Sequence, residues 1–113
     1  MQKQRKPLRK LLQRILTNLT INAIQAMPKG GKLIIGASSN GRQMIVTVAD
    51  TGVGIPDHVK PKLFTPMMTT KAKGQGLGLA VVKKSVEAMG GEITFESQLG
   101  KGTKFTICFK SKI

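Results

Sequence analysis

The sequence predicts an α+β domain in which helices pack on one face of a mixed, mostly antiparallel sheet. The order of elements carries this prediction: a long helix, two strands, a weakly patterned segment, a second helix and two further strands. Helices and strands in this arrangement bury their apolar sides against each other as two layers. A chain of 113 residues also suits one core. We therefore expect a single domain over residues 1–113, without internal repeats.

Composition indicates a globular protein with a strongly basic charge. Lysine and arginine number 19 against five acidic residues, which gives a net charge of +14 and favours anionic partners. The chain has no Trp, no Tyr and four Phe, and it lacks zinc-finger or helix-turn-helix spacing, so we do not expect nucleic acid as a partner. It contains no apolar run of about 18 residues and no signal-peptide pattern. We expect a cytoplasmic domain, which a longer protein could anchor at a membrane.

The first helix is predicted over residues 8–27, where apolar residues recur every three or four positions. Pro28 and the glycines after it end the pattern, and the basic residues 1–7 are expected to be disordered. Asn18 and Asn22 lie one turn apart, near the edge of the apolar stripe. Asparagine is a mediocre helix former, so two of them suggest a polar function, although a solvated helix face would explain them as well.

Two strands over residues 32–37 and 43–49 are predicted to form an antiparallel hairpin around the turn 38–41. The second strand leads into Asp50, which precedes Gly52 and Gly54. A carboxylate at a strand end can accept hydrogen bonds from an amino group held against a turn without side chains. An ordinary acidic turn is the alternative, because Asp and Gly are common turn residues.

A short helix is predicted over residues 57–63, and the segment that follows has the weak periodicity expected of a lid. The stretch Gly74-Gln75-Gly76-Leu77-Gly78-Leu79 then precedes a helix over residues 77–89. Three glycines expose the backbone, and free N–H groups at a helix start attract anions, so a phosphate chain could bind here. The stretch matches neither a P-loop nor a dinucleotide fingerprint. A simple helix-entry turn remains the alternative.

The last two strands are predicted over residues 92–96 and 103–109, joined by the turn Gly100-Lys101-Gly102. Cys108 lies in the second of these strands. As the single cysteine of the chain it has no partner for an internal disulfide or a metal cluster, so we expect it to be buried in the strand.

Five stretches together resemble the ATP-binding catalytic domain of sensor histidine kinases, over roughly residues 8–109. In chain order they are Asn18-Leu19-Thr20-Ile21-Asn22-Ala23, Asp50-Thr51-Gly52-Val53-Gly54, Phe64-Thr65-Pro66, the glycine stretch 74–79 and Gly100-Lys101-Gly102-Thr103. The motifs Asn-Ala-Ile-Gln-Ala-Met and Thr-Thr-Lys are similar to the nitrogen-regulation branch with a short lid. The resemblance implies the Bergerat ATP-binding fold, a two-layer α/β sandwich that gyrase, Hsp90 and MutL ATPases share.

The resemblance also implies a role for each motif, with ATP and Mg²⁺ as the ligands. Asn22 would hold Mg²⁺ between the phosphates, next to its polar neighbour Asn18, and an amide oxygen is a reasonable ligand for this ion. Asp50 would accept the adenine amino proton, and Thr103 would complete adenine recognition through water. The glycines and lid residues would contact the nucleotide: Gly52 and Gly54 at the base, and Lys71, Gly74, Gly76, Leu77 and Gly78 at the phosphates.

Asn18 further implies which reaction the domain performs. Related ATPases place a glutamate at this position to deprotonate water, and a neutral amide cannot take that proton. Slow hydrolysis is therefore expected, with the γ-phosphoryl group donated to a histidine on a separate dimerisation domain and a response regulator downstream. The single histidine, His58, lacks the sequence context of such an acceptor and is expected at the surface. Neither an acceptor helix nor a sensor domain is recognisable in this chain.

The sequence departs from the family pattern in three places and leaves two other functions open. Met67 and Met68 replace the usual phenylalanines, Gln75 replaces a common threonine, and no acidic strand precedes the first helix.

A regulator of the same fold, acting as a serine kinase or a conformational switch, is one alternative function. An aspartic protease is another, because Ala49-Asp50-Thr51-Gly52 is the local signature of such enzymes.

Overall fold

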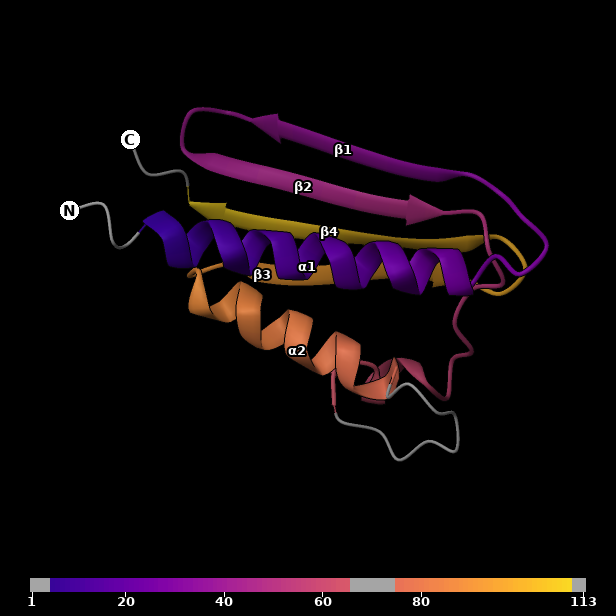
Figure 1. The fold of residues 1–113 in the computed structure, drawn as a ribbon. Helices are drawn as coiled ribbons and strands as arrows, with labels where there is room; N and C mark the ends of the chain where they lie inside the picture. Colours follow the sequence, from indigo (N-terminus) through magenta and orange to yellow (C-terminus); the bar gives the residue numbers. More distant parts are fainter. Residues whose placement is uncertain (1–4, 66–74, 111–113) are drawn as a thin grey trace.

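The computed structural model describes residues 5–65 and 75–110, and for residues 5–8 and 75–77 it describes the backbone alone. Two helices pack on one face of a four-stranded sheet (Figure 1), as the sequence predicts. The elements in chain order are α1 (Arg5–Gln25), β1 (Leu33–Ser39), β2 (Gln43–Asp50), the 3₁₀ turn η2 (Lys60–Lys62), α2 (Gln75–Ala88), β3 (Glu92–Gln98) and β4 (Gly102–Lys110).

The sheet consists of two hairpins joined through their second strands. Its order is β1-β2-β4-β3, and all three strand pairs are antiparallel in the described residues. The predicted, mostly antiparallel sheet is thus confirmed. Because side chains alternate between the faces of a strand, Val46, Val48 and Asp50 of β2 point to the same face, and all three are buried. This face lies under the helices.

The core lies between this face and the two helices. Its six most completely buried large side chains come in pairs from three sources. Ile15 and Leu19 lie one turn apart on α1, and Val82 and Val86 do the same on α2, so each helix presents a narrow apolar stripe. The sheet contributes Val48 and Ile107.

Within the described ranges, 5–65 and 75–110, no helix is long and apolar enough to cross a membrane.

Two elements differ from the prediction by more than two residues at one end. Helix α1 begins at Arg5 rather than Leu8, so residues 5–7 are helical instead of disordered. Pro7 is tolerated there because the first N–H groups of a helix have no partner within the helix. The short helix predicted over residues 57–63 is reduced to the single turn η2, which contains Pro61 and has no side-chain cap. The predicted lid, including Met67, Met68 and Lys71, lies outside the described residues.

An aromatic cluster holds the segment after η2 against the sheet. The ring of Phe64 packs edge-on against those of Phe95 and Phe105, with centroid distances of 5.7 and 6.2 Å. The ammonium group of Lys83 lies 5.5 Å from the centre of the Phe64 ring, within the range of a cation–π contact. Phe64 therefore fixes the chain at the entrance to the predicted lid, while α2 begins on its far side.

The ends of several helices and strands lie together at one end of the molecule. Helix α1 and strand β2 run in the same direction, while α2 and β4 run back (Figure 1). The end of α1, the end of β2, the turn between β3 and β4 and the start of α2 therefore lie at the same end of the molecule. The described parts of the motifs that the sequence singled out lie toward this end.

Candidate functional site

The register of the sheet places two predicted residues opposite each other. Asp50, the last residue of β2, pairs with Thr103 near the start of β4, and both are more than nine-tenths buried. Directly opposed residues of antiparallel strands point to the same face, with Cβ atoms about 4.5–5.5 Å apart. The carboxylate and the hydroxyl thus form a polar pair on the face that the helices cover.

Short hydrogen bonds hold the turn that follows Asp50. The carboxylate oxygen Oδ1 of Asp50 accepts the N–H of Gly52 at 2.8 Å. The N–H of Val53 donates to the carbonyl of Ala26 at the end of α1, at 2.9 Å, and its own carbonyl accepts the N–H of Gly100 at 2.8 Å. The backbone of Val53 therefore links the end of α1 to the turn between β3 and β4, while the N–H of Gly52 holds the Asp50 carboxylate.

The glycines of this turn are required by the packing of the protein itself. A Cβ atom at Gly52 would overlap the carbonyl of Ala26, and one at Gly54 would overlap the carbonyl of Gln98. Gly54 also has φ +80°, a conformation that other residues rarely adopt. The sequence suggested that both glycines let a base approach the chain. The structure adds an independent reason for them, which is close contact between backbone segments.

A single methyl group at Gly52 is expected to destabilise the domain. Ala26 directly follows α1, and its N–H is hydrogen-bonded to the carbonyls of Asn22 and Ala23, so its backbone cannot easily move away. Gly52→Ala should therefore lower the free energy of unfolding by about 1–3 kcal/mol, the usual cost of overpacking. Gly78→Ala is the matched control, because no described atom lies within 4 Å of its added methyl group and alanine favours a helix by about 0.5–1 kcal/mol. Urea unfolding measures both, and equal stability of the two variants would contradict the packing argument.

Asn18 and Asn22 lie on α1 as predicted, one turn apart and half-buried. The buried residues Ile15, Leu19 and Ala23 alternate with them, so both asparagines border the apolar stripe. Among the described residues, no hydrogen bond engages either side-chain amide. The backbone carbonyl of Asn22 accepts the N–H of Ala26 at 3.0 Å, which places Asn22 one turn before the contact with the Asp50 turn.

The start of α2 lies at the same end of the molecule. Gly76 and Leu77 are in its first turn, and Gly78 is half-buried with open space at its Cβ position among the described atoms. Lys71 and Gly74 lie outside the described residues. The structure thus brings Asp50, Gly52, Gly54 and Thr103 together around one turn. Asn22 lies one helical turn before the contact with Ala26, and the first turn of α2 lies at the same end of the molecule.

The sequence did not identify two further polar residues at this end. Ser97 on β3 hydrogen-bonds to Thr103, with 2.8 Å between the hydroxyl oxygens. Lys60 of η2 donates to the carbonyl of Ser97 at 2.9 Å and pairs with Asp57 at 3.0 Å. A serine at an alternating strand position is a weak signal, and only the pairing of β3 with β4 places it beside Thr103. His58 is exposed, as predicted.

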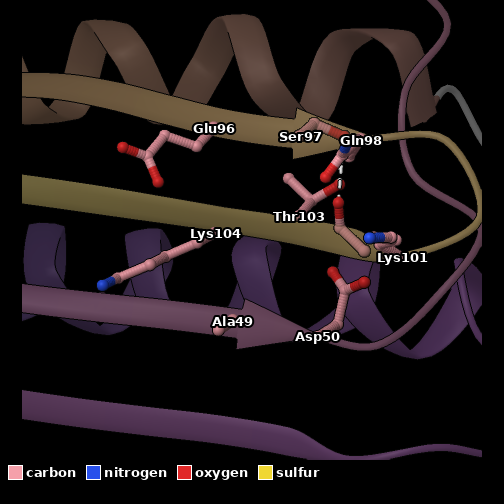
Figure 2. A pocket seen from close by; sticks show the side chains of 9 residues that line it. Ala49, Asp50, Glu96, Ser97, Gln98, Lys101, Thr103 and Lys104 are labelled. Carbon is pink, nitrogen blue, oxygen red and sulfur yellow. Dashed lines mark hydrogen bonds between the residues drawn. The ribbon is translucent and has the colours of Figure 1, made fainter.

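A depression of about 310 Å³ touches the same residues from the other side of the sheet. Figure 2 views it with both helices behind the strands. Glu96 and Lys104 border it, and they alternate with the buried residues of their strands, so they point to the face without helices. We place the candidate site on the helix side instead, because the Asp50 and Thr103 side chains are buried there.

Comparisons with known proteins agree on one family. Residues 8–113 match the family model of histidine kinase-, DNA gyrase B- and HSP90-like ATPases. The chain is 47% identical over 96 residues to the sensor histidine kinase ZraS of Escherichia coli K12, and the aligned part covers 85% of this chain and 21% of that protein. It is 38% identical to sporulation kinase D of Bacillus subtilis, over 85% of this chain and 19% of that protein. It therefore spans about a fifth of the length of these relatives.

Solved structures show the same arrangement of helices and strands. The catalytic domain of the histidine kinase ThkA superposes with a TM-score of 0.77 at 35% identity, over 90% of this chain and 67% of that one. Full-length ShkA in complex with AMPPNP gives a TM-score of 0.78 at 31% identity, over 91% of this chain and 22% of that one. The fold predicted from the sequence is thus found in histidine kinase catalytic domains.

Proposed function

The chain belongs to the histidine kinase-, DNA gyrase B- and HSP90-like ATPase family, and from that premise we propose that it binds Mg–ATP and donates the γ-phosphoryl group to a histidine on a separate domain. The observation that carries the proposal is the buried pair of Asp50 and Thr103 at the ends of β2 and β4. A buried carboxylate needs a hydrogen-bonding partner. The N–H of Gly52 donates a hydrogen bond to one oxygen of Asp50, and an adenine amino group would donate to the other.

The residues present also fit a magnesium ion bound with the nucleotide. Asn22 offers an amide oxygen at the edge of the α1 stripe, and Mg²⁺ accepts such a hard ligand together with phosphate oxygens and water. The ion would neutralise charge on the phosphates during transfer. Glycine backbone at the start of α2, from Gly74 through Gly76 and Leu77 to Gly78, would bind the phosphates through N–H groups, and Lys71 would add a positive charge.

Asn18 supports transfer to a protein rather than to water. Its amide cannot act as a general base, so bound ATP would be hydrolysed slowly and would remain available to an acceptor. The partners we propose are a histidine-bearing dimerisation domain and, downstream, a response regulator, as in two-component signalling in the cytoplasm. ShkA, a structural relative, was solved with AMPPNP, which supports the nucleotide assignment. A regulator of the same fold that phosphorylates serine, or only changes conformation, would use the same ATP site.

The aspartic-protease hypothesis accounts for much less of the chain. It explains only Ala49-Asp50-Thr51-Gly52, whereas the ATPase family covers residues 8–113. In the structure, Thr51 of this motif accepts the N–H of Lys32 at 2.9 Å and helps to fix the start of β1. The motif thus has a structural role in the ATPase fold.

Thermal unfolding with and without nucleotide tests the proposal directly. A ligand that binds the folded state alone stabilises it by about 2.7 kcal/mol at 100 times its dissociation constant. We expect ATP and ADP with Mg²⁺ to raise the unfolding temperature, and ATP without Mg²⁺ to raise it less. Pepstatin should have no effect. Protection by pepstatin, or equal unfolding temperatures with and without nucleotide, would contradict the proposed function.

A further inference from the structure

Ser97 uses all of its hydrogen-bonding capacity inside the candidate site. A serine hydroxyl has one proton to donate and two lone pairs to accept with. The oxygen of Ser97 lies 2.7 Å from the N–H of Ile55, 3.2 Å from the carbonyl of Gly102 and 2.8 Å from the hydroxyl of Thr103. Three neighbours therefore match its three hydrogen-bonding positions.

The chemistry of these neighbours determines which atom is the donor and which is the acceptor in each hydrogen bond. The Ile55 N–H can only donate, and the Gly102 carbonyl can only accept, so the proton of Ser97 goes to Gly102. The hydroxyl of Thr103 must then donate its own proton to Ser97. Once that proton is used, Thr103 has only lone pairs left for a ligand. The arrangement makes Thr103 an acceptor.

Asp50 is the second acceptor at this position. It lies directly opposite Thr103 across the β2–β4 pair, and its carboxylate can only accept hydrogen bonds. A ligand that approaches Asp50 and Thr103 therefore meets two hydrogen-bond acceptors, and neither side chain offers it a donor. An amino group, with two N–H bonds, complements the pair directly or through water. A carbonyl group at the same position would face lone pairs alone.

We propose that Ser97 is a positioning residue that fixes Thr103 as an acceptor and thereby makes the site prefer a 6-aminopurine to a 6-oxopurine nucleotide. The inference rests on the proposed binding of ATP. It assigns selectivity to a residue that does not itself contact the base. Removal of the Ser97 hydroxyl frees the Thr103 proton, and a free hydroxyl can donate to an oxo group as well as accept from an amino group.

Titration calorimetry with ATP and inosine triphosphate tests this assignment, since the two nucleotides share ribose and triphosphate and differ only at the 6-amino or 6-oxo group and at N1, which carries a proton in the 6-oxo base. The wild type should prefer ATP. Ser97→Ala should reduce the ratio of the two affinities by about 3- to 10-fold, the value of one neutral hydrogen bond. Ser97→Thr keeps the hydroxyl and should retain the wild-type ratio. A purely structural defect would weaken both nucleotides equally and leave the ratio unchanged.

Two further variants complete the test. In a Thr103→Val background, Ser97→Ala should not change the ratio further, because the hydroxyl that it orients is gone. Ser97→Cys keeps the shape of the side chain with a somewhat larger atom and weaker hydrogen bonding, so it should lower the ratio even if Ser97→Ala does not fold. An unchanged ratio in folded Ser97→Ala or Ser97→Cys overturns the role of Ser97 while ATP binding stands. A wild type that binds neither nucleotide overturns the proposed function as well.

Discussion

Replacement of Asp50 with asparagine is expected to weaken ATP and ADP binding by about 10- to 150-fold. This corresponds to the loss of one charge-assisted hydrogen bond, roughly 1.5–3 kcal/mol. The amide oxygen of the variant can still accept the Gly52 N–H, which the Asp50 carboxylate accepts at 2.8 Å. Its NH₂ group would then face the adenine amino group, donor against donor. Titration calorimetry of both nucleotides measures the change.

Asp57→Asn is the matched control for this experiment. Asp57 is an exposed acid whose side chain is 96% accessible and pairs with Lys60 at 3.0 Å. Surface ion pairs contribute little to stability, and the substitution removes the same charge from the protein. We expect ATP affinity within about 2-fold of the wild type. Unchanged ATP affinity in folded Asp50→Asn would show that Asp50 does not bind the base.

Asn22→Ala is expected to abolish phosphoryl transfer to the acceptor domain. The variant lacks the oxygen that we assign to Mg²⁺, and the metal in phosphoryl transfer is worth several kcal/mol, so a loss of more than about 100-fold follows. Asn22→Asp keeps an oxygen ligand and should retain part of the activity. The measurement is radiolabelled ATP mixed with the domain and its acceptor domain, scored as acid-labile, base-stable phosphate on the acceptor.

His58→Ala provides the contrast in the same assay. His58 is exposed and precedes η2, so its removal should leave transfer nearly unchanged. The domain without its acceptor should carry no stable phosphohistidine, and its ATPase activity should be slow because Asn18 offers no base. Stable label on the isolated domain that disappears in His58→Ala would identify His58 as the phosphorylation site. That result would contradict the division of labour between two domains.

Much of the fold could be predicted from local patterns in the sequence. The three-and-four spacing from Leu8 to Met27 predicted α1, and alternation with turn residues predicted both hairpins. The start of α1 at Arg5 was missed because polar, basic residues show no periodicity even where they continue a helix. The extent of η2 was overestimated because Pro61 removes a backbone donor.

The site was only partly predictable for a different reason. Asp50 was singled out by its place at a strand end before two glycines, and Thr103 through a family resemblance, but their direct opposition depends on the register of β2 with β4, which local sequence does not specify. Ser97 was missed for the same reason. Gly52 and Gly54 were expected to be glycines because a nucleotide base approaches the chain there. In the structure, a side chain at either position would instead overlap a backbone carbonyl of the protein, that of Ala26 or Gln98. Contacts between distant segments are the information that the sequence patterns lacked.

The pairing of β2 with β4 also has a consequence for how the protein folds. Each hairpin closes a short loop, but Asp50 and Thr103 are more than 50 residues apart along the chain, and such a non-local pairing is reached slowly because its loop entropy must be lost first. Neither hairpin alone can assemble the base-binding pair. Nucleotide should therefore bind only after the two hairpins have paired, and it should slow global unfolding by stabilising the folded state.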